Sequence, residues 1–326
     1  MIDPMKRWAA HDGRPDYAGL VTYAGLPYTE EPEELAGADA VIVGAPLDEL
    51  TSDAPGTRYG PRAIRSASCA PGPHLEAGLD PLAELRVIDY GDAAVLPADP
   101  RGSHRAIERA VGEVLAAGAV PIVLGGDHSI AEPDVGACAS VHGPVGLVHF
   151  DAHTDTAAEL FGAELSHGTP MYRLVESGSV DPARYVQIGL RGYWPGEEEF
   201  DWQRRRGVVS HPMHEVRDRG IRAVVADALG ALGPGPVFMS VDVDVLDPAF
   251  APGTGTPEPG GMASADLLWA CREIAGSVEL VGADVVEVLP DRVGARDITA
   301  LVADRIVREI LTGVALRRGP ARGSDE

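Results

Sequence analysis

The stretch VGLVHFDAHTD, residues 145–155, joins an apolar run to three polar side chains at alternate positions. Val145–Phe150 has the composition of a strand that is buried on both faces. Asp151, His153 and Asp155 follow at the point where this strand is expected to end. Because an unpaired charge beside a buried strand is costly, we predict that these three side chains face a cation.

Similar apolar, β-prone runs occur along most of the chain, with amphipathic stretches between them. We predict strands in the runs that start at Ala40, Leu85, Ala119, Val145, Tyr185, Pro236 and Val278. Residues 103–118 have helical spacing, with Ser103 as the expected N-cap and Gly118 as the stop. Continuous apolar strands that alternate with helices indicate a parallel sheet covered on both faces. We therefore expect an α/β fold of three layers, α-β-α, with a mostly parallel central sheet in a single domain.

The bulk composition narrows the possible classes of function. The chain has 326 residues, of which 45% are hydrophobic and 24% are charged, as in an ordinary globular protein. No apolar run approaches the roughly 20 residues of a membrane span, and the first residues have no apolar signal-peptide core. Cys69, Cys138 and Cys271 are far apart, so we expect no disulfide framework and a cytoplasmic location. The net charge of −23 argues against a nucleic-acid partner and is compatible with metal ions or a cationic substrate.

Three predicted strand ends carry side chains that commonly bind metal ions. The segments are GGDHS (125–129), DAHTD (151–155) and SVDVDVLDP (240–248). They provide six candidate ligands: His128, Asp151, His153, Asp155, Asp242 and Asp244. Ligands of parallel α/β sheets bind at the carboxyl ends of the strands, so we expect the three segments to be part of the functional site.

The chemistry of this ligand set indicates two hard divalent ions. Residues i and i+2 of an extended chain point to the same side, so Asp151 with His153, and Asp242 with Asp244, could each aim two ligands at one point. Six ligands are too many for one tetrahedral zinc, and none of them is a thiolate. Imidazole mixed with carboxylate suits manganese or a similar ion, and carboxylates can bridge two ions about 3.5–4 Å apart.

These segments resemble the signature motifs of the ureohydrolase family, which includes arginase and agmatinase. GGDHS, DAHTD and SVDVDVLDPAFAPGTGTPEPGG (240–261) resemble family motifs, as do PGTRYGPRAIR (55–65) and SHGTP (166–170). The resemblance runs from about residue 38 to 311 and is greatest to agmatinase or guanidinobutyrase. It implies the arginase-like fold, with a catalytic domain at 31–316. We expect an N-terminal extension at 1–30 and a disordered tail at 317–326.

The resemblance also implies how the candidate residues are used. One Mn2+ would be bound by His128, Asp151, Asp155 and Asp242, and the second by Asp151, His153, Asp242 and Asp244. His167 of SHGTP would shuttle a proton, Glu287 would pair with the substrate guanidinium, and Asp155 could accept a hydrogen bond from the attacking hydroxide. Glu287 lies in the apolar run that starts at Val278, where a buried charge requires a partner.

The implied activity is hydrolysis of a guanidino group to urea and a primary amine. Arginases have an Asn two residues after DAHTD, and this chain has Ala157, which argues against L-arginine. Agmatine, which would yield putrescine for polyamine biosynthesis, is the first expectation, and guanidinobutyrate, guanidinopropionate or a proclavaminate-type guanidino acid is the alternative. Glu197–Glu199 would favour an ammonium group and Arg191 a carboxylate, unless the glutamates only form a solvated helix start.

Two interpretations from other classes remain open. A manganese-binding regulatory protein would not require His167 or Glu287, and both residues are present. A single-zinc deacetylase would use fewer ligands than the six found. The family resemblance further implies a homo-oligomer, a trimer or hexamer, that acts on a small cationic guanidino substrate without a nucleic-acid or membrane partner.

Overall fold

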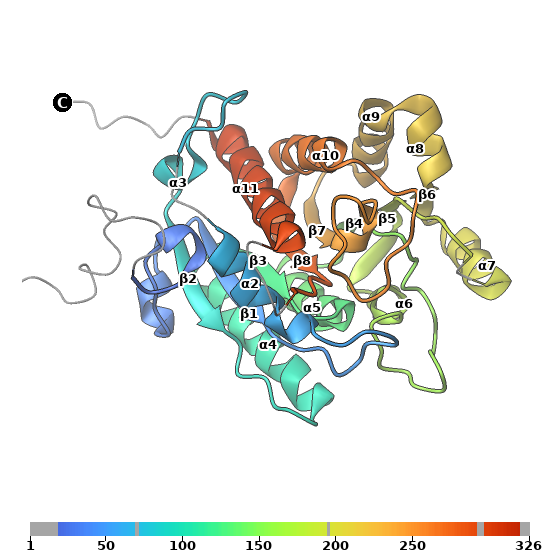
Figure 1. Cartoon of the computed structure of the whole chain (residues 1–326), viewed down its shortest axis with the longest axis horizontal. Coiled ribbons are helices and arrows are strands. Elements are labelled where there is room, and N and C mark those ends of the chain that lie inside the picture. Colours follow the sequence, from blue (N-terminus) through green and yellow to red (C-terminus); the bar gives the residue numbers. More distant parts are fainter. Residues whose placement is uncertain (1–18, 69–71, 194–195, 292–296, 320–326) are drawn as a thin grey trace, which may run out of the picture.

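An eight-stranded sheet forms the centre of the molecule (Figure 1). The structure, a computed structural model, describes residues 19–68, 72–193, 196–291 and 297–319. The strand order is β2-β1-β3-β8-β7-β4-β5-β6, and every strand pair is parallel. The predicted α/β class is therefore confirmed, and the sheet is entirely rather than mostly parallel.

The elements follow one another as alternating strands and helices. The strands are β1 (Ala40–Ala45), β2 (Val87–Asp92), β3 (Val120–Gly125), β4 (Val145–Phe150), β5 (Val180–Ile188), β6 (Val209–His211), β7 (Pro236–Asp242) and β8 (Glu279–Val286). The α-helices are α2 (Gly60–Ala67), α3 (Pro81–Glu84), α4 (Pro100–Ala116), α5 (Ala131–His142), α6 (Pro170–Glu176), α7 (Glu197–Arg206), α8 (Met213–Arg219), α9 (Ile221–Leu232), α10 (Ser264–Ser277) and α11 (Ile298–Arg318). The 3-10 helices are η1 (Tyr23–Gly25), η2 (Pro32–Leu35), η3 (Thr57–Tyr59), η4 (His128–Ile130) and η5 (Val243–Val245).

The sheet separates two hydrophobic cores, which gives the three layers. In β3, Ile122 and Leu124 belong to the core that includes residues of α2, α9, α10 and α11. Val123, between them, belongs to the core that includes residues of α4, α5 and α6. Because successive side chains of a strand point to opposite faces, continuous apolar strands bury both faces of the sheet. Figure 1 shows α9, α10 and α11 on one side of the strands and α4, α5 and α6 on the other.

The seven predicted strands are all present, with two differences at one edge of the sheet. β5 begins at Val180 rather than at Tyr185, and the three-residue strand β6 was not predicted. Segment 180–184 contains Asp181, Pro182 and Arg184, which concealed its extended conformation. β6 pairs only with β5, and three residues are too few to give a periodic signal.

The predicted N-cap of the helix after β2 is wrong by four residues. Helix α4 begins at Pro100, and the carboxylate of Asp99 accepts a hydrogen bond from the N–H of Gly102 at 2.8 Å. Ser103 lies inside the helix, where its hydroxyl contacts the backbone N–H and C=O of Leu96. The expected stop is confirmed, because the helix ends at Ala116 and Gly118 has a positive φ.

The described parts of the two expected terminal segments contain regular structure. Tyr23 of η1 is fully buried, and its backbone N–H donates to Asp89 at 2.7 Å. Helix α11 continues to Arg318, two residues into the stretch expected to be disordered. Residues 1–18 and 320–326, and Cys69, lie outside the described residues.

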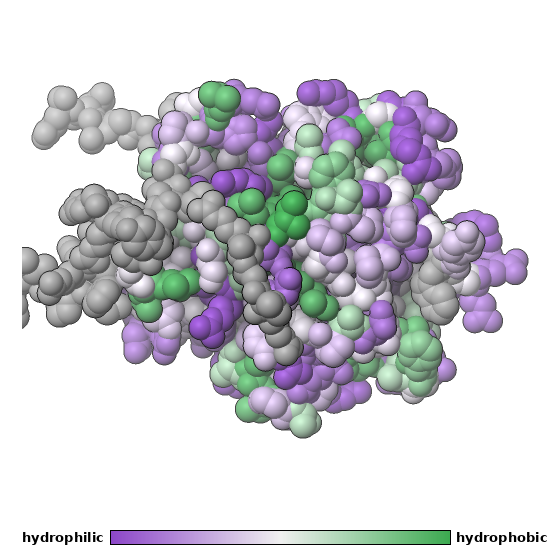
Figure 2. Space-filling view, in the orientation of Figure 1, coloured by the Kyte–Doolittle hydropathy of each residue, from purple (hydrophilic) through white to green (hydrophobic). Residues whose placement is uncertain are grey.

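On the face drawn in Figure 2, the described residues form small hydrophobic patches that are surrounded by hydrophilic side chains. Of the helices that the structure describes, none has both the length and the apolar character needed to cross a bilayer.

Candidate active site

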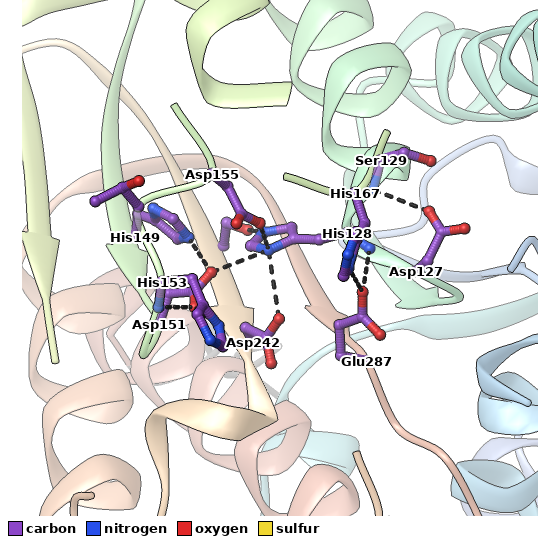
Figure 3. Close-up of polar contacts among 12 residues, drawn as sticks. Asp127, His128, Ser129, His149, Asp151, His153, Asp155, His167, Asp242 and Glu287 are labelled. Carbon is purple, nitrogen blue, oxygen red and sulfur yellow. Dashed lines mark hydrogen bonds and ion pairs between the residues drawn. The ribbon is translucent and has the colours of Figure 1, made fainter. Parts of the chain in front are cut away.

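The candidate residues gather at the carboxyl ends of four adjacent strands, β3, β8, β7 and β4. His128 follows β3, Asp151 follows β4, Asp242 ends β7, and Glu287 follows β8. Gly126 makes the sharp turn after β3 possible, because a Cβ there would lie 2.3 Å from the carbonyl oxygen of Leu47. Figure 3 shows the side chains pointing toward one another from these strand ends.

Asp151 and Asp242 each form a tight turn in which the side-chain carboxylate accepts a hydrogen bond from the backbone N–H two residues later. The Asp151 carboxylate accepts from the N–H of His153 at 2.6 Å, and the Asp242 carboxylate accepts from the N–H of Asp244 at 2.8 Å. The pairs therefore converge through turns, and the expectation that an extended chain aligns them is wrong. Asp155 adopts a left-handed backbone conformation, with φ of 50°.

Three of the six candidate ligands surround the imidazole nitrogen of a fourth, His128. His128 Nδ1 lies 2.9 Å from Asp155 Oδ2, 3.1 Å from Asp151 Oδ2 and 3.4 Å from Asp242 Oδ2. His128 is fully buried, and only 1% of the Asp151 surface is exposed. This group matches the set expected for the first ion.

A second group shares Asp151 with the first. His153 Nδ1 lies 2.9 Å from Asp244 Oδ2 and 3.5 Å from Asp151 Oδ1. The two oxygens of Asp151 thus face different imidazoles, which is the placement that a bridging carboxylate requires. Together the groups contain all six candidate ligands.

The site fits divalent cations. His128 Nδ1 and Asp244 Oδ2 are buried, and although each lies close to a group of the site, neither forms a hydrogen bond of suitable geometry among the described residues. Burial and the charges of Asp244 and Asp151 raise the pKa of Asp242 well above its usual range. Burial and the charge of Asp151 also raise the pKa of Asp244. Oxygen and imidazole donors crowded in this way could hold two ions of the manganese type, which would neutralise the repulsion.

His149 is a site residue that the sequence reasoning missed. It is buried in β4, its Nε2 lies 2.7 Å from Asp151 Oδ2, and its Nδ1 lies 3.0 Å from the Tyr185 hydroxyl. His149 also belongs to a group with His128 and Asp151 whose donor atoms lie within 4.8 Å of one another. The sequence contains a local indication of this role, because His149 continues the series of polar residues at alternate positions 151, 153 and 155 back into the strand.

Glu287 lies beside the six candidate ligands and links two loops. Its Oε1 accepts from the backbone N–H of His128 at 3.0 Å and contacts His167 Nδ1 at 3.0 Å. Its Oε2 is buried and has no hydrogen-bond partner in the described part of the chain. The residue was expected inside a strand, but β8 ends at Val286 and Glu287 follows it with φ of 60°.

His167 is held between Glu287 and Ser52. Its Nε2 lies 2.7 Å from the Ser52 hydroxyl and 3.1 Å from the Ser52 backbone nitrogen. Burial lowers the pKa of His167, but the hydrogen bond and charge of Glu287 outweigh burial and raise the pKa to about 9. Ser52 was not predicted, because a serine in a loop 115 residues from its partner gives no local signal.

A cavity of about 250 Å³ opens onto these residues. The residues lining it are Ser52, His153, Thr154, Asp155, Ala157, Leu160, Phe161, His167, Gly168, Glu199, Asp242 and Thr256. We call Leu160, Phe161 and Glu199 the mouth of the cavity. Among the described lining residues there is no Lys or Arg.

The two charged groups proposed for substrate selection differ in their surroundings. The Arg191 guanidinium donates to backbone carbonyls, including those of Asp244 at 2.6 Å, Leu246 at 3.1 Å and Glu258 at 2.6 Å. It therefore secures a loop, and the expectation that it could receive a substrate carboxylate is not supported. Glu199 lines the cavity, whereas Glu197 and Glu198 are exposed in the first turn of α7.

Known proteins share this fold and sequence over most of the chain. A guanidinobutyrase of Pseudomonas aeruginosa is 39% identical over 91% of this chain and 93% of its own length. A mitochondrial agmatinase of Gallus gallus is 42% identical over 83% of this chain and 79% of its own length. The solved proclavaminate amidino hydrolase from Streptomyces clavuligerus has a TM-score of 0.87 and 37% identity, and covers 93% of this chain and 100% of its own. Residues 38–313 match the model of the Arginase family, and the protein therefore belongs to that family.

Proposed function

We propose that this protein is a binuclear manganese hydrolase that cleaves a small guanidino substrate to urea and a primary amine. As a member of the arginase family, it is a hydrolase of C–N bonds in guanidino compounds. Membership of this family argues against the two alternative functions, a manganese-binding regulatory protein and a single-zinc deacetylase. The observation that carries the proposal is the pair of candidate ligand groups that share Asp151, beside Glu287 Oε2, for which the described residues offer no hydrogen-bond partner.

We assign the six acids and imidazoles as metal ligands. His128, Asp151, Asp155 and Asp242 would hold one Mn2+, and Asp151, His153, Asp242 and Asp244 would hold the other. Two such ions, when bound, lower the pKa of water and so supply hydroxide near neutral pH.

Glu287 would bind the guanidinium of the substrate. Its Oε2 is a buried acceptor without a hydrogen-bond partner in the described chain, and a buried carboxylate is stabilised by a cation that can donate two hydrogen bonds. Because Oε1 is fixed by the N–H of His128, the carboxylate plane is set before substrate arrives. A substrate held in this orientation would have its guanidino carbon over the ligand groups, which would lower the entropic part of the barrier.

His167 would protonate the leaving amine. Water adds to the guanidino carbon, the C–N bond to the chain breaks, and the nitrogen that departs takes up a proton as urea forms. A guanidinium on Glu287 neutralises the charge that raises the pKa of His167 to about 9. Substrate binding therefore lowers that pKa toward its ordinary value and makes His167 a stronger acid when the amine needs a proton.

Agmatine is our first choice among the substrates. Its distal ammonium would meet Glu199 at the mouth, and the described lining contains no cation that a carboxylate tail could pair with. Guanidino acids are the second candidate, because the guanidinobutyrase relative is as similar to this chain as the agmatinase relative is.

A urea-release screen tests the proposal directly. The protein loaded with manganese is assayed with agmatine, guanidinobutyrate, guanidinopropionate and L-arginine, and we expect the highest kcat/KM for agmatine. Turnover of guanidino acids alone would reject the role of Glu199 and retain the reaction. The absence of urea from all four substrates would reject the function.

We extend the proposal to a homo-oligomer in the cytoplasm. Light scattering coupled to size-exclusion chromatography would give the subunit number, and a monomeric mass would reject this part.

A further inference from the structure

A second pair of acids lies behind the His128 ring, on the side opposite to the Nδ1 atom that faces the other proposed ligands. Asp134 of α5 and Asp284 of β8 are both 0% exposed. Burial, the charge of Asp284 and a hydrogen bond with it are among the causes that raise the pKa of Asp134. Asp134 Oδ2 and Asp284 Oδ2 have no donor among the described residues. Two ionised carboxylates in contact repel, so the arrangement requires a proton between them.

The hydrogen bonds favour Asp134 as the acid that holds the proton. Asp284 Oδ1 accepts from the Ser240 hydroxyl at 2.8 Å and from the N–H of Val241 at 3.2 Å. Within the described part of the chain, Asp134 Oδ1 accepts only from the N–H of Val135 at 2.6 Å. Two donors stabilise the charge on Asp284 more than one stabilises it on Asp134. Burial and the charge of Asp284 accordingly raise the pKa of Asp134 well above its usual range.

The pair reaches the proposed metal centre through Ser240. The Ser240 hydroxyl lies 2.9 Å from His128 Nε2, on the opposite side of the ring from Nδ1. With its own hydrogen directed to Asp284, this hydroxyl can only accept from Nε2–H. The neutral imidazole then carries its proton on Nε2 and presents the lone pair of Nδ1 to Asp151, Asp155 and Asp242.

We propose that Asp134 is protonated at neutral pH and donates to Asp284, so that a chain of hydrogen bonds through Asp284 and Ser240 holds His128 ready to bind a metal. Asp134 is thus a positioning residue, and its effect on the metal rests on the proposed function. The groups around the pair are His128 of η4, His149 of β4 and Cys138, one turn further along α5. Cys138 is buried and stays neutral, because burial and the two acids raise the pKa of its thiol.

Asp134→Asn tests whether Asp134 is protonated in the folded protein, because asparagine has the same shape and cannot ionise. The amide oxygen can keep the bond to Val135, and the NH2 group can donate to Asp284 without any ionisation. In the wild type, the unfolded Asp134 loses its proton above about pH 4, whereas the folded one keeps it. The free energy of unfolding of the wild type therefore falls as pH rises from about 4 toward the higher pKa of folded Asp134. The Asn variant has no proton to lose at this position, so its free energy of unfolding does not fall for this reason.

Thermal unfolding of metal-free protein measures the difference. We expect the midpoint of Asp134→Asn to exceed that of the wild type by more at about pH 8 than at about pH 5. Asp218→Asn, at an exposed position of α8, is the control and should show no such trend. A midpoint difference for Asp134→Asn that does not change with pH would overturn the protonated state.

Asp134→Leu tests the chain to His128, since leucine is similar in size and cannot donate. We expect Asp134→Leu to bind Mn2+ about tenfold more weakly than Asp134→Asn in a calorimetric titration. Equal affinities of the two variants would overturn the positioning role. If the wild type bound no manganese, the proposed function and the link to it would both fail, while the unfolding data would still decide where the proton resides.

Discussion

The two ends of the cavity are built in different ways. At its inner end, the six proposed ligands come from strand ends and the turns beside them, and Asp151 there is only 1% exposed. At the mouth, Leu160 and Phe161 belong to a loop and Phe161 is 86% exposed. The chemistry is therefore placed by a packed sheet, whereas the part that would contact the substrate tail can change without disturbing the core. This difference fits the comparisons, in which relatives with different named substrates share one fold.

The largest effect is expected at the inner end. Asp242→Ala removes an oxygen 3.4 Å from His128 Nδ1 and the acceptor of the Asp244 N–H. Metal content should fall to one ion per subunit or fewer, and urea release should fall to background. Both are measured on the same sample, by elemental analysis and a colorimetric assay.

Phe161→Ala is the matched change at the mouth. It should leave metal content at the wild-type level. Full activity of Asp242→Ala would show that the inner end does not work as a bridged metal centre, and metal loss in Phe161→Ala would remove the distinction between the two ends.

The next effect separates metal binding from substrate binding. In Glu287→Gln, the amide oxygen can still accept from the N–H of His128, but the charge for the guanidinium is lost. We expect wild-type metal content and a fall in kcat/KM of at least about a hundredfold, because the substrate is no longer oriented. A variant that turned over normally would exclude the guanidinium-binding role.

The smallest effect is expected at the mouth itself. Glu199→Gln should raise KM for agmatine up to about fivefold with kcat unchanged, as expected for a partly exposed charge pair. Glu197→Gln, in the same turn of α7 but exposed, should change neither value. The effect of Glu199→Gln should shrink at high ionic strength. An unchanged KM at low salt would remove Glu199 from substrate recognition.

The same contrast explains what could be predicted from the sequence. The strands and their polar ends were readable because apolar runs such as Val145–Phe150 and the motifs after them are local in the chain. Contacts between segments that are distant in the sequence could not be predicted. Ser52 reaches His167 across 115 residues, and Arg191 is held by carbonyls more than 50 positions away. Two errors had usable local signals: Pro100 marks the first turn of α4, and His149 continues the alternate polar positions.

Two of the acids that we propose for the reaction have backbone conformations that residues other than glycine rarely adopt. Asp155 and Glu287 have φ of 50° and 60°, a region in which glycine and asparagine are more at ease. A laboratory selection for heat resistance alone should therefore favour glycine or asparagine at these positions. Such variants would be more stable but would lack the proposed activity, so any thermostabilisation of this enzyme needs turnover as a second criterion.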